Sequence, residues 1–510
     1  MDNAIFTHIK TWFFRYVDKF INMSDDDDLL SNLKLKAEHT LRVEENIVRL
    51  AEVIGLDEEQ KNTARTIALF HDIGRFPQYL QYRTFRDAES VNHAVLSSEI
   101  VEGSGVLKEL PILERQIIIE SIKFHNALNE PDNLLQPLFL RLIRDADKLD
   151  IWRVFSECFR LPSEQRPRGA VLGLPDSEGV SEEVLKAIKE KRIAFLKDVR
   201  NQNDFRLLQL SWVFDLNFRE SFKILKERDY FSVIGDIKNQ SDMVEDAIRS
   251  VLTYIEKKLN AKVYFIGAGP GDPELLTVKG KKILDSADVI IYAGSLINPD
   301  ILKGLKAELY DSAGMNLEEI IEIMRRAYHE AKVVARLHSG DVSIYSAINE
   351  QINRLKRLNI EFEVIPGVSS FQAGAAVLSQ ELTIPEISQT VILTRLEGRT
   401  PVPEKERLRD LARHNATMVI FLSAGLIERV QEELLQAYPK DTPFVVIEKA
   451  TWPEQRIFRG RLRDLATAVK EAGIKRTALI YVGNTLGVSE EASGKESKLY
   501  NKDFKHGYRQ

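Results

Sequence analysis

The sequence predicts a two-domain protein, with an all-helical N-terminal domain followed by an α/β domain. The chain has 510 residues, which exceeds the roughly 250–300 residues at which a single hydrophobic core stops growing. Residues 1–260 carry apolar side chains every three or four positions and few strand signals. From Lys262 onward, short apolar runs alternate with helical segments, and this pattern is typical of an α/β fold.

The helical pattern is clearest in residues 40–54 and 242–259. In the second half we expect these apolar runs to form strands: VYFIGAG, DVIIYAG, KVVARLHSG, FEVIPGV, QTVILTR, ATMVIFLSA, TPFVVIEKA and TALIYVGN. Several of them end in Gly, Ser or Asp where a helix begins, which is where parallel sheets place ligand sites. We therefore set the domains at residues 1–260 and 261–487, followed by a polar tail at 488–510.

The composition argues against several classes of partner. A net charge of -6 offers no basic surface for nucleic acid. No apolar run reaches the roughly 18 residues needed to span a membrane. The single cysteine, Cys158, cannot form an intrachain disulfide, which suits a reducing compartment. We therefore expect a cytoplasmic protein that acts on small molecules.

Three glycine-containing segments of the second half directly follow predicted strands. Glycine lets backbone N–H groups approach a ligand closely. The first segment nearly fits the dinucleotide fingerprint G-x-G-x-x-G, but Pro270 and Pro273 interrupt it and its third glycine is absent. A dinucleotide-binding fold is therefore not predicted. The segments are GAGPGDPELLTVKG at 267–280, LHSGDVSIY at 337–345 and PGVSSFQAGAA at 366–376.

In this order, the three segments resemble the signatures of the tetrapyrrole methylases, which are class III methyltransferases. The resemblance runs along the whole of residues 261–487. It implies two α/β lobes, S-adenosyl-L-methionine as the cofactor, and a homodimer. Carried over residue by residue, it implies a cofactor site made of Pro270, Ser339, Gly340, Asp341, Ile344, Ser369, Ser370, Leu422 and Ala450.

The chemical types of these residues suit such a cofactor. A carboxylate such as Asp341 can accept hydrogen bonds, a hydroxyl such as that of Ser370 can satisfy polar groups, and Leu422 can cover the adenine. An ordinary turn is the alternative for Gly340 and Asp341. An ordinary core position is the alternative for Leu422.

Three stretches point to one branch of the family: YAGSL at 292–296, LHSGD at 337–341 and QTVILTRLEGRTPVPEKERL at 389–408. They resemble the branch that methylates precorrin-4, or its cobalt complex, at C-11 in cobalamin biosynthesis. Methylases of uroporphyrinogen III carry an acidic residue where this chain has Ala293, so the resemblance disfavours that substrate. Val342 replaces the family's usual proline.

A macrocycle with many carboxylates should be bound by cationic or hydrogen-bond-donating side chains. The candidates lie at or just beyond predicted strand ends, and surface solvation is the alternative for each of the arginines. They are Arg336, His338, Arg395 and Arg399.

The helical half carries histidines and aspartates at spacings that let separate helices each supply a ligand: His39, His71, Asp72, His93, His125 and Asp147. Imidazole and carboxylate form a ligand set for a divalent transition metal such as Fe, Mn, Zn or Co, and six such groups can hold two ions. We expect His39, His71, Asp72 and Asp147 to converge on one ion, with His93 and His125 completing a second position. Asp145 is close enough in sequence to be the ligand in place of Asp147.

This series, with LFHDIGRF at 69–76 and RDADKLD at 144–150, resembles the HD superfamily of metal-dependent phosphohydrolases. The resemblance implies hydrolysis of a phosphate ester, with Asp72 as the catalytic residue that bridges two ions. A metal-binding domain without turnover is the alternative.

For the whole chain we expect a bifunctional protein in which an all-α HD domain is followed by a two-lobed α/β methylase domain. Two alternatives remain open. One is a sensor or scaffold in which one half binds a ligand without turnover. The other is a methylase of another substrate, such as the precursor of diphthamide.

Overall fold

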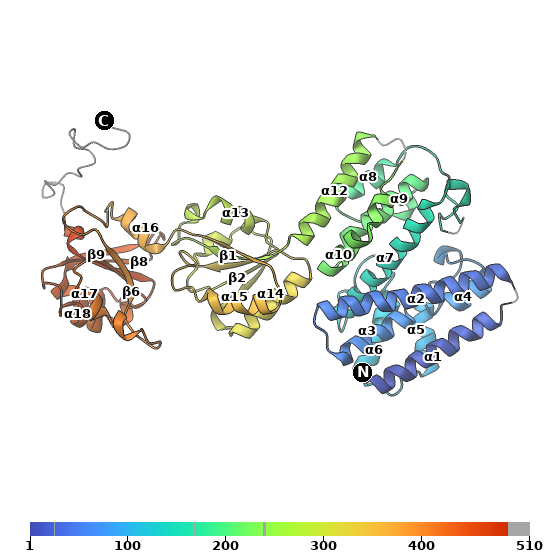
Figure 1. Cartoon of the computed structure of the whole chain (residues 1–510), viewed down its shortest axis with the longest axis horizontal. Helices are drawn as coiled ribbons and strands as arrows, with labels where there is room; N and C mark the ends of the chain where they lie inside the picture. Colours follow the sequence, from blue (N-terminus) through green and yellow to red (C-terminus); the bar gives the residue numbers. More distant parts are fainter. Residues whose placement is uncertain (25, 168–169, 238–240, 488–510) are drawn as a thin grey trace. The chain divides into compact units, whose positions relative to one another are not determined.

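The computed structural model describes residues 1–24, 26–167, 170–237 and 241–487. It contains two compact units, one of Met1–Ala261 with Arg326–Lys332, the other of Lys262–Arg325 and the residues from Val333 onward. The first unit is helical and the second is α/β (Figure 1), so the predicted fold class is confirmed. Within the described ranges, no helix combines the length and the hydropathy that a membrane crossing requires. The predicted tail at 488–510 lies outside the described residues.

Local sequence signals define several helices of the first unit. Asp26 caps α2 by accepting bonds from the next turn, and Asp57 and Gln60 form a capping box at the start of α3. The apolar faces of the helices meet in one core around Phe70 and Trp152. The helices are α1 (Asn3–Asn22), α2 (Asp27–Val53), α3 (Glu58–Phe70), α4 (Arg75–Tyr82), α5 (His93–Ser104), α6 (Ile112–Phe124), α7 (Pro137–Arg160), α8 (Glu182–Lys189), α9 (Gln202–Ser211), α10 (Arg219–Arg228), α11 (Tyr230–Ile234) and α12 (Asp242–Leu259).

The first lobe of the α/β unit is built on a parallel sheet with strand order β3-β2-β4-β1-β5. Side chains alternate between its two faces, so Ile266 and Leu337 join a core with Leu284 of α13. Helices α14 and α15 cover the other face (Figure 1). The elements are β1 (Val263–Gly267), α13 (Val278–Asp285), β2 (Val289–Tyr292), β3 (Glu308–Asp311), α14 (Leu317–His329), β4 (Val334–His338), α15 (Ile348–Arg357) and β5 (Phe362–Ile365).

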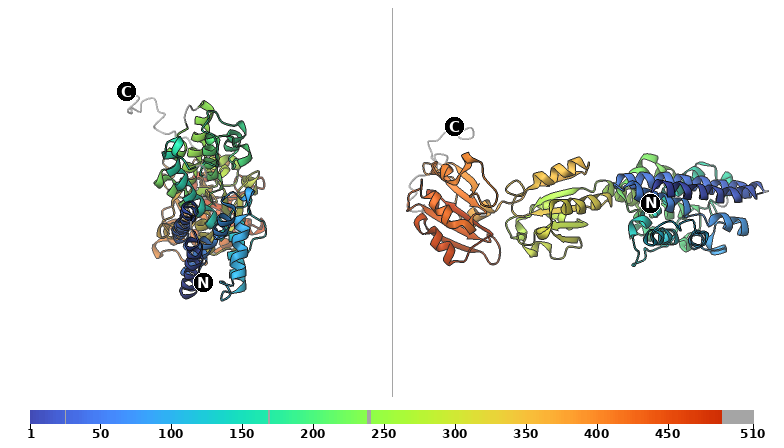
Figure 2. Two further views of the ribbon diagram at one scale, coloured as in Figure 1. Left: turned by 90° about the vertical axis from the view of Figure 1, so that its right-hand side faces the viewer. Right: turned by 90° about the horizontal axis from the view of Figure 1, so that it is seen from below.

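The second lobe forms a mixed sheet with order β6-β7-β10-β8-β9. This sheet is separate from that of the first lobe (Figure 2). Only β6 and β7 pair in parallel, and the other pairs are antiparallel. One sheet face packs on α17, α18 and α19, and the other packs on α16. The elements are α16 (Ser370–Val377), β6 (Val391–Arg395), α17 (Leu408–Ala412), β7 (Thr417–Phe421), α18 (Ile427–Leu434), β8 (Pro443–Glu448), β9 (Arg456–Arg461), α19 (Leu465–Glu471) and β10 (Ala478–Val482).

Two strands, β3 and β9, do not correspond to any predicted apolar run. Both lie at sheet edges, and their sequences ELYD and RIFRGR are mostly exposed or half-buried. An edge strand need not be apolar on both faces, and charged residues protect it from pairing with another chain. The apolar-run criterion therefore found the strands inside the sheets and the edge strands β5 and β6, but it missed the more polar edge strands β3 and β9.

Candidate functional site

The three glycine-containing loops follow β1, β4 and β5, and β1 lies between the other two strands. Since the strands are parallel, the loops emerge at one edge of the sheet. Their backbones touch, because a Cβ on Gly267 would lie 2.6 Å from the Cα of Gly367 and 2.8 Å from the carbonyl oxygen of Gly340. Close backbone approach therefore requires glycine at this junction.

The first two loops are joined through backbone atoms alone. Gly340 N donates to Gly269 O at 2.8 Å, and Gly269 N donates to Gly340 O at 3.2 Å. The φ angles are 73° at Gly269 and 70° at Gly340, a region that glycine adopts at little cost. The motif glycines thus fix the relative position of the two loops.

Asp341 joins the third loop to the second. Its Oδ2 accepts a hydrogen bond from Gly367 N at 2.8 Å, and its Oδ1 accepts one from Ser343 N at 2.9 Å. Burial alone would raise the pKa of Asp341, but the bonds from Ser343 and Gly367 hold it below its ordinary value. Both oxygens already bind the protein, so Asp341 has a loop-tethering role that the sequence did not indicate.

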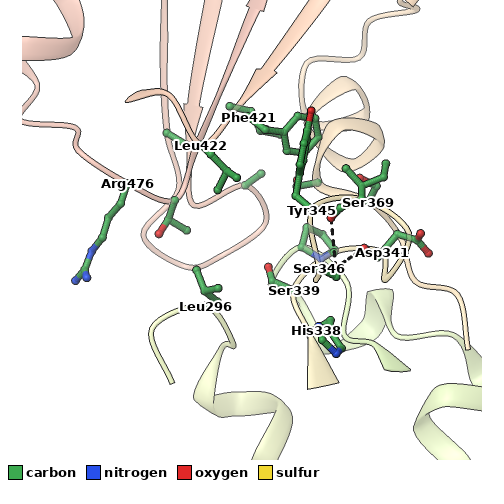
Figure 3. A pocket seen from close by; sticks show the side chains of 18 of the residues that line it. Leu296, His338, Ser339, Asp341, Tyr345, Ser346, Ser369, Phe421, Leu422 and Arg476 are labelled. Atoms are coloured by element: carbon green, nitrogen blue, oxygen red, sulfur yellow. Dashed lines mark hydrogen bonds between the residues drawn. The ribbon is translucent and has the colours of Figure 1, made fainter. Parts of the chain in front are cut away.

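A pocket of about 410 Å³ lies beside these loops and is lined by residues of both lobes, a size that suits a small ligand. Leu422 from the second lobe and Ser339 from the first approach it from different sides (Figure 3). All the residues that the sequence suggested for the cofactor line this one pocket: Pro270, Ser339, Gly340, Asp341, Ile344, Ser369, Ser370, Leu422 and Ala450.

The pocket residues differ in what they can offer a ligand. The hydroxyls of Ser339 and Ser370 bind no partner among the described residues, so they remain available to a ligand. The hydroxyl of Ser369 instead caps the start of α16 in a capping box with Gln372. Leu422 is 71% exposed, so it is not an ordinary core residue and can cover an apolar group.

Several non-glycine residues that line the pocket have a left-handed backbone. The φ angles are 56° at Tyr345, 54° at Leu422, 49° at Lys449 and 53° at Thr477. Such conformations cost of order 1–3 kcal/mol each and cluster at ligand sites, where the surrounding fold holds them. Their gathering here supports a ligand-binding role for the pocket.

The second lobe also holds the first loop. Trp452 Nε1 donates to Pro270 O at 2.9 Å, and Asp272 N donates to Thr451 Oγ1 at 3.0 Å. The Trp452 ring lies so close to Gly271 that a Cβ there would clash. The first loop therefore bridges the two lobes at the pocket.

The basic candidates divide into two groups. Arg336 and His338 line the pocket, whereas Arg395 and Arg399 are not among its lining residues. Arg395 instead donates to the carbonyls of its own loop, at Thr400 and Pro401. Three basic residues of the second lobe also line the pocket, and no sequence motif marked them: Lys449, Lys475 and Arg476.

A second candidate site lies in the helical unit, where the structure brings all six proposed metal ligands together. All are buried except Asp147, whose side chain is 19% exposed. The ligands come from different helices or helix ends: His39 from α2, His71 and Asp72 after α3, His93 from α5, His125 after α6 and Asp147 from α7.

The ligand atoms face one another at short range. His39 Nε2 lies 3.1 Å from Asp147 Oδ1, and His93 Nε2 lies 3.3 Å from Asp72 Oδ1. Ligand atoms fall within 4.8 Å of one another in two triads, and His71 belongs to both rather than to one position as we expected. The triads are His39, His71 and Asp147, and His71, Asp72 and His125.

Nδ1 of each of the four imidazoles contacts a hydrogen-bond acceptor. This contact orients the ring and leaves Nε2 as the nitrogen that faces the other ligands. Nδ1 of His71 and of His125 must donate to a backbone carbonyl, so Nε2 is the ring atom of each that can face a ligand. Nε2 of His39 and of His71 is buried and has no hydrogen-bond partner among the described residues. The Nδ1 contacts are all 2.7 Å, from His39 to Asp150, His71 to Ala68 O, His93 to Asp87 and His125 to Ile122 O.

The charge states also fit a metal centre. Burial alone would raise the pKa of Asp72, but Lys36, which lies 2.8 Å from Oδ2, and the nearby histidines and Arg75 hold it well below its ordinary value. Burial, followed by the charges of His93 and His71, lowers the pKa of His125 to about 3. Ionised carboxylate and neutral imidazole are the forms that bind a metal, so Asp72 and His125 both fit a metal site.

The structure distinguishes between Asp145 and Asp147. Asp145 is fully buried and accepts hydrogen bonds from Ser221 Oγ at 2.6 Å and from the backbone of Asn217 and Phe218. Residues two apart on a helix point to nearly opposite sides, so Asp147 alone faces the histidines. Asp145 instead holds the segment before α10.

Two family models match the chain. The model for tetrapyrrole (corrin/porphyrin) methylases matches residues 262–466, and the model for the HD domain matches residues 37–152. The first match contains the three glycine-containing loops, and the second contains all six proposed metal ligands.

The similar proteins cover the α/β part. The cobalt-precorrin-4 C(11)-methyltransferase of Methanocaldococcus jannaschii is 56% identical over 253 residues, which are 49% of this chain and 96% of that protein. The precorrin-4 C(11)-methyltransferase of Pseudomonas aeruginosa is 47% identical over 248 residues, 48% of this chain and 98% of the relative. A solved cobalt precorrin-4 methyltransferase is 48% identical, with a TM-score of 0.44, and covers 45% of this chain and 97% of its own.

Proposed function

The chain belongs to the tetrapyrrole methylase family, and on this premise we propose that its α/β unit transfers a methyl group from S-adenosyl-L-methionine to C-11 of precorrin-4 or of its cobalt complex. The observation that carries the proposal is the pocket, in which residues from three separate loops and from the second lobe meet. The names of the relatives that are 56% and 47% identical support the choice of substrate.

The cofactor supplies a methyl group on a sulfonium, which carries its own leaving group. The task left to the chain is positioning. The hydroxyls of Ser339 and Ser370 are free to satisfy polar groups of the cofactor, and the exposed Leu422 can cover its adenine. The bound cofactor would supply the methyl group to a carbon of the substrate and leave as S-adenosylhomocysteine, while the macrocycle would release one proton to water.

The test is mass spectrometry of the full chain incubated with S-adenosyl-L-methionine and, in parallel, precorrin-4 or cobalt-precorrin-4. We expect one added methyl group and an equal amount of S-adenosylhomocysteine, and the relative rates identify the preferred substrate. Leu422→Asp should reduce the rate of methylation. Leu435→Asp, also at an exposed leucine of the second lobe, is the control. Absence of methylation with both macrocycles would refute the substrate assignment.

For the helical unit we propose a metal-dependent phosphohydrolase. The observation that favours it is the set of inward-facing Nε2 atoms, two of them buried without a partner. His39, His71 and Asp147 would hold one divalent transition metal ion, and Asp72, His93 and His125 would hold a second. Asp72 suits a bridging role, because its Oδ2 faces His39 while its Oδ1 faces His93. Two bound ions supply an activated water and a Lewis acid for a phosphate ester.

Elemental analysis of protein purified without chelator is the first test. We expect iron, manganese, zinc or cobalt at up to two ions per chain. Activity of the metal-loaded protein is then measured on a panel of phosphomonoesters and nucleotides. Protein that carries no metal and takes none up would contradict the metal site. Loaded protein that hydrolyses nothing on the panel would reduce the unit to a metal-binding domain.

A further inference from the structure

Arg336 is a buried cation in the wall of the methylase pocket. It lies on β4, is only 8% exposed and lines the pocket. Its Nη1 donates to Ser312 Oγ at 2.8 Å and its Nε donates to Gln351 Oε1 at 3.3 Å. Both partners are neutral, and Arg336 makes no ion pair with any described residue.

The two partners are themselves held in orientation. Ser312 donates its hydroxyl proton to Tyr292 O at 2.9 Å, so its oxygen is left to accept from Arg336. Gln351 Nε2 donates to Ala347 O at 3.2 Å, which directs Oε1 toward Arg336. The guanidinium plane is therefore fixed in advance. Of its five N–H donors, two are used and the rest remain for a ligand.

A buried charge without a counter-ion is costly unless a partner arrives. Burial lowers the pKa of Arg336 to about 10, so the side chain stays charged at neutral pH. His338, two residues further along the same strand face, adds a buried Nε2 that no described residue hydrogen-bonds. The wall at β4 thus offers fixed donors and positive charge to the pocket and contributes no carboxylate to balance them.

We propose that Arg336 binds a carboxylate of the tetrapyrrole substrate and so sets the orientation of the macrocycle in the pocket. The inference deepens the proposed methyltransferase function and rests on it. A planar guanidinium matches a carboxylate in bidentate geometry, and the partners Ser312 and Gln351 present the side chain in one orientation.

The cofactor also has a carboxylate, but the topology favours the substrate. In the strand order β3-β2-β4-β1-β5, the loops assigned to the cofactor follow β4, β1 and β5. Arg336 instead bonds Ser312, which directly follows β3. The guanidinium therefore belongs to the β3 and β2 half of the lobe, on the other side of β4 from the loop of Ser369 and Ser370.

The test compares Arg336→Gln and Arg336→Lys with wild type in the full chain. Arg354→Gln is the matched control, because Arg354 lies on α15 near Gln351 but pairs with Glu318 at the surface. For cobalt-precorrin-4 we expect Arg336→Gln to raise KM at least tenfold, as loss of a charge-assisted bond should. Arg336→Lys should have an intermediate KM. The Kd for S-adenosylhomocysteine, measured by calorimetry, should stay within twofold in both variants.

An unchanged KM in Arg336→Gln would overturn the inference and leave the methyltransferase proposal intact. A parallel rise in the Kd for S-adenosylhomocysteine would also overturn it, since the carboxylate would then be the cofactor's. If Arg336→Gln does not fold, Arg336→Lys decides by the same two readouts.

If wild type methylates neither macrocycle, the proposed function fails separately. Uroporphyrin and its neutral methyl ester then serve as probes in a fluorescence titration. If wild type and Arg354→Gln bind the acid more tightly than the ester, and Arg336→Gln does not, the result supports carboxylate binding by Arg336. Equal binding of acid and ester by wild type contradicts it.

Discussion

The two candidate sites are built in opposite ways. The methylase pocket is assembled from loop backbone, with glycines in contact and only a few free side-chain groups. The helical centre is assembled from side chains, with imidazoles and carboxylates directed inward from separate helices. Backbone construction leaves a pocket of about 410 Å³ open to an organic ligand, whereas side-chain convergence produces a small, dense cluster of donor atoms.

This difference predicts that the two sites respond differently to mutation. At the helical centre each side chain supplies a donor atom that nothing else replaces. In the pocket, the contacts are distributed over several loops, so single changes should weaken binding by degrees. A mutation at the helical centre should therefore abolish metal-dependent activity, whereas a mutation of an equally buried pocket residue should only reduce cofactor binding.

The largest effect should come from Asp72→Asn. The variant keeps the shape of a buried side chain that contacts Lys36, Arg75 and His93, but it removes the charge that a bridging ligand needs. We expect metal content to fall to background in elemental analysis and hydrolysis to disappear. Asp132→Asn, at an exposed position of the same unit, should retain both. Full metal loading of Asp72→Asn would contradict the view that each side chain at the helical centre is irreplaceable.

Gly340→Ala should reduce cofactor affinity at least tenfold. The φ of 70° costs an alanine of order 1 kcal/mol, and the new methyl group would point to Ser369 and Ser370 at van der Waals distance. Gly473→Ala has the same backbone penalty, with φ 69° and open space around it. Both variants should lose similar thermal stability, and calorimetry with S-adenosylhomocysteine should separate them. Equal affinities would show that the loop junction is not part of the site.

Asp341→Ala should weaken cofactor binding about tenfold, because the third loop loses its tether at Gly367. The lowered pKa of Asp341 also predicts a pH effect. Its contribution to stability is full above the ordinary pKa of about 3.9 and is lost as pH falls through the lowered folded value. Melts of wild type and Asp341→Ala should therefore converge in acid.

The control for this prediction is Asp288→Ala, which removes a carboxylate that accepts from the backbone of Val333 outside the pocket. It should cost stability without changing the cofactor Kd. A stability difference between wild type and Asp341→Ala that persists unchanged at the lowest pH would contradict the tethering role.

The smallest effect should come from Trp452→Phe. The change removes only the bond from Nε1 to Pro270 O and keeps an aromatic ring beside Gly271. A net hydrogen bond contributes about 0.5–1.5 kcal/mol, so cofactor affinity should fall by twofold to tenfold. Isothermal calorimetry on Trp452→Phe and on Trp212→Phe, which alters the helical unit, measures the difference. A complete loss of binding would mean that the contact between the two lobes contributes more to cofactor affinity than the junction of the glycine-containing loops.

Much of this protein could be predicted from sequence because its signals are local. The alternation of apolar runs with helices identified the interior strands, and both family resemblances were confirmed by the matching models. The edge strands β3 and β9 were not predicted, because they carry no buried apolar run. The mixed strand direction of the second sheet was not predicted either, since strand direction is set by pairing between distant segments.

The sequence by itself determined which kinds of chemistry are present: glycine loops after strands, and a series of histidines and aspartates in helices. Tertiary structure alone decided what each residue does with its polar atoms. It turned Asp145 toward Ser221 and Asp147 toward His39, and gave Asp341 a tether. It also left Arg336 charged and without a carboxylate partner among the described residues. The physical reason is that hydrogen-bond partners are chosen by distance in space, and the partners here are far apart along the chain.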